Sequence, residues 1–260
     1  MKLPSIITII CLVLLSTPII LAQQNYVYHI DLQNVVDDQV KVVLTPPKIK
    51  EHKATFILPS VIPGSYARKD YGRFVVKFKA FDANNTILPT KRKGDNLICI
   101  KKAHTLHKIE YWVDDTWDHH DANSWVFEPG GSNIEADKNF SINHHAFFGY
   151  FEGYKNLNFE LHFSKPEQMY GSCPLEKKSV DTQTDIFYAP NYVDLVDSPL
   201  MYSLPDTTNF MVKNTAVHVA VYSPNNLVTS KQITEYLQPL SNALGNFFGT
   251  MPVDRYYFLF

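Results

Sequence analysis

The sequence has few cysteines, few glycines and no excess of basic residues, and each shortage excludes a class of protein. Only three of the 260 residues are cysteine, too few for a disulfide framework. Ten glycines and 16 prolines exclude a collagen-like or low-complexity chain. Lysine and arginine number 24 against 26 acidic residues, so the formal charge is −2 and no basic excess can neutralise nucleic-acid phosphates. Nucleic acid is therefore not expected as a partner.

Catalytic and cofactor motifs are also missing. The sequence contains no H-E-x-x-H zinc motif, no G-x-S-x-G nucleophile elbow, no C-x-x-C pair, no Walker loop and no dinucleotide fingerprint. Ten histidines are present, but His104 and His107 would point to opposite faces of a strand. The pairs His119-His120 and His144-His145 could combine across space, yet adjacent histidines seldom ligate one ion together. We therefore expect no catalytic residue and no complete metal site in this chain.

The one long apolar run lies at the N-terminus. Lys2 precedes a mostly apolar stretch from Ile6 to Ala22, which ends at the polar pair Gln23-Gln24. This pattern is typical of a cleaved signal peptide over residues 1–22 and predicts a secreted or periplasmic protein without membrane contact after cleavage. A permanent membrane anchor is the alternative, but the stretch is short, contains Pro18 and has no basic flank behind it.

Export would place two cysteines, Cys99 and Cys173, in an oxidising compartment. They either form a disulfide or remain two buried thiols, and the sequence leaves both possibilities open. A chain of this length can bury a core that does not need a disulfide for its stability.

Apolar residues recur with a period of two along most of the chain. Alternate residues from Tyr26 to Leu32 are apolar, as in a half-buried strand. In a later run we expect alternate residues from Phe74 to Ala80 on the buried side. Runs of the same kind, separated by proline, asparagine or glycine, lie at 40–45, 54–58, 97–100, 107–113 and 158–163. This spacing predicts a mostly β protein with an antiparallel β-sandwich-like body.

A long irregular stretch from Asp114 to Ala146 interrupts the strands. It contains Trp117, Trp125 and the histidine pairs named above. Loops of this length are uncommon in a compact domain unless they have a function. The stretch is either a packed surface loop or the binding surface of a stand-alone secreted module that takes peptide or glycan.

The periodicity changes near the C-terminus. Residues 216–222 alternate as a strand, and Thr229 with Gln232 matches a capping box. Apolar residues then recur at three- and four-residue steps, at Ile233, Tyr236, Leu237, Leu240, Leu244, Phe247 and Phe248. These features predict one amphipathic helix, kinked or split at Pro239 and ended by Gly249.

Residues 255–260 begin a further strand that is still apolar at the last residue, Phe260. An unpaired apolar strand at a terminus would leave an exposed sheet edge that can pair with another chain and aggregate. We therefore expect the polypeptide to be part of a longer one, either naturally or because the sequence is shortened. A truncated product without a function of its own is a further possibility.

One short turn carries residues that could contact a ligand. Pro63 fixes φ and Gly64 permits a positive φ, which suits a sharp turn. Such a turn would present Ser65 and Tyr66 beside Arg68, whose guanidinium could bind a carboxylate.

A second segment, residues 189–199, contains Asp194 and Asp197 three residues apart. The two aspartates could cap a helix or bind a cation, although a structural turn is the more common outcome.

In their order and spacing, these segments resemble the N-terminal region of the glycyl aminopeptidase family. The matching pieces are the turn at 63–68, the run at 192–199 and the closing segment 248–256, and the resemblance extends in order over essentially the whole mature chain. Members of that family are secreted zinc metallopeptidases with an N-terminal β-rich domain, a thermolysin-like catalytic domain and usually a PDZ domain. The resemblance implies an N-terminal β-domain over residues 23–205 and, over 206–260, the first strand and helix of an incomplete α+β catalytic domain.

The resemblance also implies where the chemistry lies. In this family two histidines of H-E-x-x-H and a later glutamate hold the zinc, and the glutamate of the motif activates the bound water. Those residues would follow Phe260, so zinc and the peptide substrate are expected only through the missing catalytic domain. For this chain the resemblance implies a scaffold role beside the substrate cleft. The residues concerned are the candidate substrate-facing turn Gly64, Ser65, Tyr66 and Arg68, and the family-like pair Asp194 and Asp197.

Overall fold

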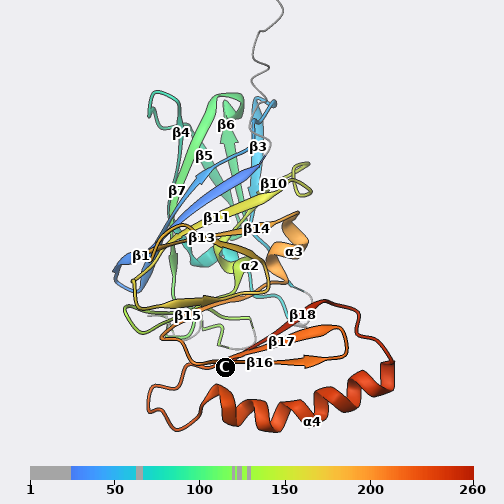
Figure 1. Cartoon of the computed structure of the whole chain (residues 1–260). Helices are drawn as coiled ribbons and strands as arrows, with labels where there is room; N and C mark the ends of the chain where they lie inside the picture. Colours follow the sequence, from blue (N-terminus) through green and yellow to red (C-terminus); the bar gives the residue numbers. More distant parts are fainter. Residues whose placement is uncertain (1–24, 63–66, 119–120, 122–124, 128–129) are drawn as a thin grey trace, which may run out of the picture.

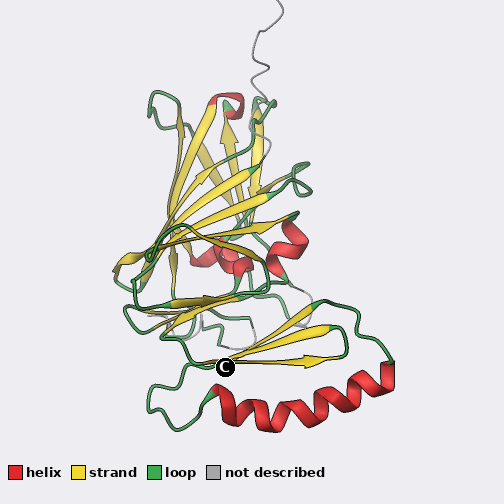
Figure 2. Cartoon of the chain, in the orientation of Figure 1, coloured by secondary structure: helices red, strands yellow, loops and turns green. Residues whose placement is uncertain are grey.

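The computed structural model describes residues 25–62, 67–118, 121, 125–127 and 130–260 (Figure 1). Strands dominate these residues and form four sheets, and one long helix lies beside the C-terminal sheet (Figure 2). The predicted mostly β fold with antiparallel sheets is thereby confirmed. In the described part of the chain, no helix is both long and apolar enough to cross a membrane.

The largest sheet has seven strands, in the order β13-β14-β11-β1-β2-β7-β4. Only the β1–β11 pair is parallel, and each other neighbouring pair is antiparallel. The strands are β1 (Tyr26–Val36), β2 (Gln39–Thr45), β4 (Val75–Asp82), β7 (Leu106–Asp114), β11 (Phe159–Ser164), β13 (Glu176–Ser179) and β14 (Thr184–Ala189).

Two four-stranded sheets complete the body. One has the order β10-β3-β6-β5 and comprises β3 (Lys53–Ile57), β5 (Thr90–Lys93), β6 (Leu97–Lys101) and β10 (Tyr150–Phe151). The other has the order β12-β15-β9-β8 and comprises β8 (Asn133–Glu135), β9 (Asn139–Ile142), β12 (Tyr170–Ser172) and β15 (Leu200–Ser203). Short helical turns join the strands at η1 (Tyr71–Phe74), η2 (Ala103–Thr105), α2 (His144–Phe147) and α3 (Tyr192–Val196).

The C-terminal residues form a separate small layer, which we call the terminal module, from Thr207 to Leu259. Its sheet has the order β16-β17-β18, with β16 (Thr207–Val212), β17 (Thr215–Ala220) and β18 (Arg255–Leu259). Helix α4 (Ser230–Phe248) runs along one face of this sheet, below the body in the view of Figure 1.

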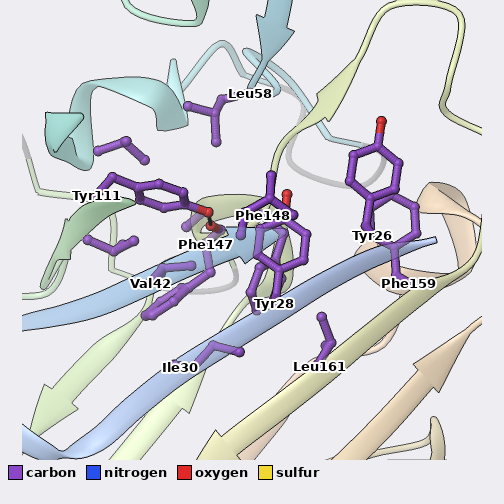
Figure 3. Close-up of a cluster of buried hydrophobic side chains, with 14 of the residues drawn as sticks. Tyr26, Tyr28, Ile30, Val42, Leu58, Tyr111, Phe147, Phe148, Phe159 and Leu161 are labelled. Carbon is purple, nitrogen blue, oxygen red and sulfur yellow. Dashed lines mark hydrogen bonds between the residues drawn. The ribbon is translucent and has the colours of Figure 1, made fainter. Parts of the chain in front are cut away.

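Aromatic side chains fill the core between the sheets (Figure 3). The predicted alternation in β1 is confirmed, because every second residue from Tyr26 to Leu32 is at most 1% exposed. The ring of Tyr26 stacks on Phe159 of the parallel neighbour at 4.4 Å. Tyr28 donates its hydroxyl to the carbonyl oxygen of Gly149 at 2.7 Å, so its polar end is satisfied inside the core.

The predicted alternation from Phe74 to Ala80 is right for Phe74 and Ala80, which are at most 1% exposed, and wrong at Val76. Phe74 belongs to η1, and Val75 rather than Val76 is fully buried. A β-bulge shifts the register between Val76 and Lys79, with Lys77 at a φ of 53°. Because a bulge adds one residue to one strand, it reverses the inward and outward assignment on either side of it.

The capping box of α4 forms as predicted. Gln232 donates its backbone N–H to Thr229 Oγ1, and Thr229 donates its own to Gln232 Oε1. Pro239 lies inside the helix without splitting it, and Gly249 ends it at a φ of 77°. At Gly245 the helix lies so close to β16 that a Cβ would be 2.7 Å from Val212 Cγ1.

The face that α4 buries is not the one that the apolar periodicity indicated. The buried residues are Ser230, Thr234 and Gly245, while Tyr236 and Phe247 are more than 80% exposed. The helix therefore packs its small and polar side on the sheet and leaves its apolar side uncovered.

Candidate functional site

The turn predicted to face a substrate lies only partly within the described residues. Gly64, Ser65 and Tyr66 are outside them, and Arg68 is inside. Arg68 Nε donates to both carboxylate oxygens of Asp70 at 2.8 Å, although the Arg68 side chain is 71% exposed. The pKa of Asp70 is lowered, first by this hydrogen bond. Arg68 therefore already holds a carboxylate of its own chain.

Asp70 in turn connects this segment to the neighbouring sheet. Its Oδ1 accepts a hydrogen bond from Asn96 Nδ2 at 2.6 Å, and Asn96 Oδ1 accepts one from the Gly72 backbone at 3.0 Å. The backbone of Asp70 also donates to the Ser60 carbonyl. These bonds fix the stem of the turn to the body of the protein.

Asp194 and Asp197 have different local roles in α3. The N-cap is Asn191, whose Oδ1 accepts from the backbone of Val193 and Asp194, so neither aspartate is the N-cap, and Asp197 is the C-cap residue. Asp194 supports the cap by accepting a hydrogen bond from Asn191 Nδ2 at 2.9 Å, and Asp197 ends the helix. Both aspartates are exposed and line the same cavity, which also receives Arg255 from β18.

The histidine pair His144-His145 is buried in α2 and connects three parts of the fold. His144 Nδ1 is 2.9 Å from the Leu195 carbonyl oxygen, and His145 Nε2 is 2.9 Å from the Gly130 carbonyl oxygen. The ring of His145 lies edge-on to Tyr71 at 4.3 Å. Burial lowers the pKa of each imidazole to about 4, so both are neutral at pH 7.

Among the described residues, no further ligating side chain joins this pair in a metal centre. Within the described ranges, no three histidine, cysteine, aspartate or glutamate side chains are grouped to hold a metal ion. The second pair, His119-His120, lies outside those ranges. In this geometry His144 and His145 act as buried hydrogen-bonding groups.

The stretch expected to be irregular from Asp114 to Ala146 forms β8, β9 and α2 in its second part, and Asp115 in its first part is a buried carboxylate. Asp115 accepts hydrogen bonds from the backbone of Trp117 at 2.5 Å and from the backbone of Ile134, and burial raises its pKa to about 6. Thr116 Oγ1 donates to the Val126 carbonyl oxygen at 2.7 Å. These bonds order both ends of the stretch, where the sequence showed no periodicity.

Cys99 and Cys173 are free thiols, so the disulfide that the sequence left open is not formed. Cys99 lies on β6 beside Thr55, with Sγ 3.8 Å from Thr55 Oγ1. Cys173 follows β12 in a different sheet and donates its buried thiol to the Ser198 carbonyl oxygen at 3.7 Å. The fold places Cys99 in one sheet and Cys173 next to another. The spacing of the cysteines in the sequence does not show this separation.

Sequence reasoning missed most of the cavity around α3. Its lining includes Glu160 from β11, Glu176 from β13, Tyr188 from β14 and Arg255 from β18. The outward position of Glu160 follows from strand alternation, but only the sheet order brings it near Asp194. No local signal in the sequence joins these residues.

The fold agrees with comparisons against known proteins. No curated protein matches the chain. The aminopeptidase N family protein from Idiomarina loihiensis superposes with a TM-score of 0.77 at 20% identity, over 90% of this chain and 38% of that one. Legionella pneumophila aminopeptidase A has a TM-score of 0.51 at 12% identity, over 92% of this chain and 28% of that one.

The M1 zinc metallopeptidase from Deinococcus radiodurans has a TM-score of 0.50 at 10% identity, over 92% of this chain and 56% of that one. At these identities the likeness shows a shared fold, and the chain spans little more than a third of the Idiomarina protein. The family model of the Peptidase M61 N-terminal domain matches residues 27–204, more than half of the chain. The chain therefore belongs to the Peptidase M61 N-terminal domain family.

Proposed function

We propose that the chain is the non-catalytic N-terminal β-domain of an exported, zinc-dependent aminopeptidase, with a scaffold role along one wall of the substrate cleft. The family match over residues 27–204 carries the proposal. A fold shared with a larger aminopeptidase N family protein, of which this chain covers 38%, supports a longer parent enzyme. Within the family we place that parent among the glycyl aminopeptidases, with a PDZ domain after its catalytic domain.

The proposal assigns zinc and the hydrolytic chemistry to polypeptide that follows residue 260 in the parent enzyme. The sequence holds no H-E-x-x-H motif, and the described residues hold no group of three metal-ligating side chains. Two histidines and a glutamate beyond this chain would bind the zinc, which would supply an activated water for attack on the peptide carbonyl. The present residues would shape the cleft without touching the reacting atoms.

The uncovered face of α4 supports the idea that further polypeptide packs here. Five large apolar side chains on this helix are between 44% and 82% exposed: Tyr236, Leu240, Leu244, Phe247 and Phe248. Contiguous apolar surface on a soluble protein usually marks a contact with another protein surface. We assign that contact to the remainder of the catalytic domain.

The proposal also includes export through a cleaved signal peptide and a substrate contact at one turn. The apolar N-terminal segment supports cleavage after Ala22, and N-terminal sequencing of the secreted protein should then begin at Gln23. For substrate contact we retain the turn Gly64, Ser65, Tyr66 and Arg68. Because only Nε of Arg68 is bonded to Asp70, a substrate carboxylate would bind through its Nη1 and Nη2 groups.

The test begins with the coding sequence downstream of the Phe260 codon. We expect an open reading frame with an H-E-x-x-H motif within about a domain's length, on the order of 100 to 200 residues. Expression of the whole frame should give cleavage of aminoacyl p-nitroanilides that chelators abolish, whereas residues 23–260 should give none. A genuine stop codon directly after residue 260, or hydrolysis by purified residues 23–260, would overturn the proposal.

A further inference from the structure

A cavity of about 600 Å³ lies between the body and the terminal module, and the proposed function gives it no role. Its volume is within the range of small-ligand sites, roughly 300 to 1,000 Å³. The body contributes Glu160, Glu176, Asp194 and Asp197 to the lining, and the terminal module contributes Arg255. The lining therefore carries four carboxylates and one guanidinium.

The carboxylates differ in the partners that they already have. Glu160 Oε1 is 2.5 Å from His162 Nε2, and Asp194 Oδ2 accepts a hydrogen bond from Asn191. Among the described side chains, no lysine, arginine or histidine forms an ion pair with Glu176 or Asp197. These two carboxylates are free to bind a cation from outside the protein.

A nearby lysine does not neutralise this wall. Lys177 follows Glu176 directly, but its ammonium is 3.0 Å from the buried carboxylate of Asp185. It also lies 4.6 Å from the centre of the Tyr170 ring. Its charge is therefore directed into the body, away from the cavity lining, of which it is not a member.

The apolar part of the lining is small. Leu175, which is 7% exposed, and the half-buried ring of Tyr188 supply it, whereas the side chains of Phe159 and Ala189 face the core. Tyr188 is the cross-strand partner of Glu160 on β11 and of Glu176 on β13, and its pKa is raised by desolvation and by the charges of these two residues. Aromatic rings beside carboxylates favour ammonium and guanidinium groups through cation–π attraction.

The arrangement does not fit a bare metal ion. No three acidic, histidine or cysteine side chains in the described part of the chain are close enough together to ligate one. Carboxylates that are spread over a cavity this wide instead suit a long organic cation. Arg255 adds a donor for a carbonyl or carboxylate oxygen of the same ligand.

We propose that this cavity binds the side chain of a lysine or arginine residue within a peptide. The aliphatic stem packs on Leu175 and Tyr188, and the charged head reaches Asp197 and Glu176. Arg255 binds a main-chain oxygen of the same peptide. The proposal concerns peptide binding by this cavity alone. A failure of the proposed aminopeptidase function would not affect it.

The test is titration of the purified chain with four N-acetylated, C-amidated tripeptides that differ only in the central residue. Peptides with lysine or arginine at the centre are expected to bind at least about tenfold more tightly than those with norleucine or glutamate, because only the first two form charge-assisted hydrogen bonds. Free arginine and spermidine distinguish a peptide site from one for a free amino acid or a polyamine. Both should bind more weakly than the lysine and arginine peptides.

Substitutions then locate the site. Asp197→Asn and Glu176→Gln should each weaken binding of the lysine peptide about tenfold, while Glu167→Gln, an exposed acid outside the lining, should leave it unchanged. Arg255→Gln should weaken the peptides but not spermidine. Equal binding of the norleucine peptide, no saturable binding, or an equal loss in the Glu167 variant would overturn the proposal. Tighter binding of spermidine or free arginine would overturn the assignment to a peptide.

Discussion

Tyr202 donates its hydroxyl to Asp185 Oδ2 at 3.0 Å, and this buried hydrogen bond joins β15 of one sheet to β14 of the largest one. Asp185 is only 1% exposed and has two further partners from β13. Ser179 Oγ donates to Oδ1 at 2.8 Å, and Lys177 Nζ lies 3.0 Å from Oδ2. A buried carboxylate is tolerated when it is paired and hydrogen-bonded in this way.

Removal of this carboxylate is expected to cost much more stability than removal of a surface ion pair. Asp185→Ala leaves the Lys177 ammonium and the Tyr202 hydroxyl without their partner and should lower the free energy of unfolding by about 3 to 5 kcal/mol. The matched control is Lys138→Ala, which breaks an exposed pair with Glu135 and should change the free energy of unfolding much less. Urea unfolding of both variants checks the difference, and similar costs would show that Asp185 does not act as a structural link.

Acid is expected to destabilise the fold through His144 and His145. Burial lowers the pKa of both to about 4, whereas an unfolded histidine has its ordinary pKa near 6.5. Between these pH values the unfolded chain binds protons that the native chain excludes. The free energy of unfolding therefore falls as the pH is lowered from 6.5 towards 4, by about 2 kcal/mol per histidine at pH 4.5.

Asp115 opposes this trend over part of the same range. Burial raises its pKa to about 6, so the native state holds a proton that the unfolded state releases above its ordinary pKa near 4. Its contribution to stability is present at low pH and is lost as the pH rises through 6.

His145→Gln should therefore flatten the fall in stability between pH 6.5 and 4.5, and Asp115→Asn should steepen it. Unfolding curves at four pH values check both slopes, and unchanged slopes would contradict the assignment.

Thiol chemistry is expected to distinguish Cys99 from Cys173. Burial raises the pKa of Cys173 to about 12, so almost none of it is thiolate at pH 8, while Cys99 is partly exposed. A thiol reagent should label Cys99 in the native protein and both residues after unfolding in guanidinium chloride. Mass spectrometry without a reductant counts the labels on residues 23–260. Loss of both labels until a reductant is added would show a disulfide instead.

The strands could be predicted from the sequence because their signal is local. In β1 the alternation of apolar residues specifies which side faces the core, and Tyr26 and Tyr28 are buried accordingly. The same holds for the capping box at Thr229 and Gln232, which needs only four consecutive residues. The bulge at Lys77 has no such local signal, since a positive φ there depends on how β4 pairs with β7.

The candidate sites could be predicted only in part. The sequence singled out Asp194 and Asp197, but the cavity that they line also needs β11, β13 and β18. Likewise, periodicity identified α4 as amphipathic without showing what covers its apolar face. Both features depend on the packing of segments that are distant in the chain.

The apolar face of α4 gives the last prediction. Tyr236 and Phe247 are 81% and 82% exposed, so replacing both by serine removes apolar surface that contacts little else in this chain. The double variant should unfold within about 1 kcal/mol of the original chain, because exposed substitutions seldom change stability by more than about 0.5 kcal/mol each. It should also reduce self-association in analytical ultracentrifugation, since less apolar surface is available for contact between copies.

A buried residue of the same module provides the control. Val219 on β17 is fully buried, and Val219→Ser should destabilise the chain by more than the double variant does, on the order of 2 kcal/mol. In the proposed parent enzyme the double substitution should lower the free energy of unfolding more than Val219→Ser does if the remaining polypeptide covers α4. Tyr236 and Phe247 would then be core residues. Equal tolerance of the double substitution in the chain and in the proposed parent enzyme would show that the remaining polypeptide leaves this face exposed.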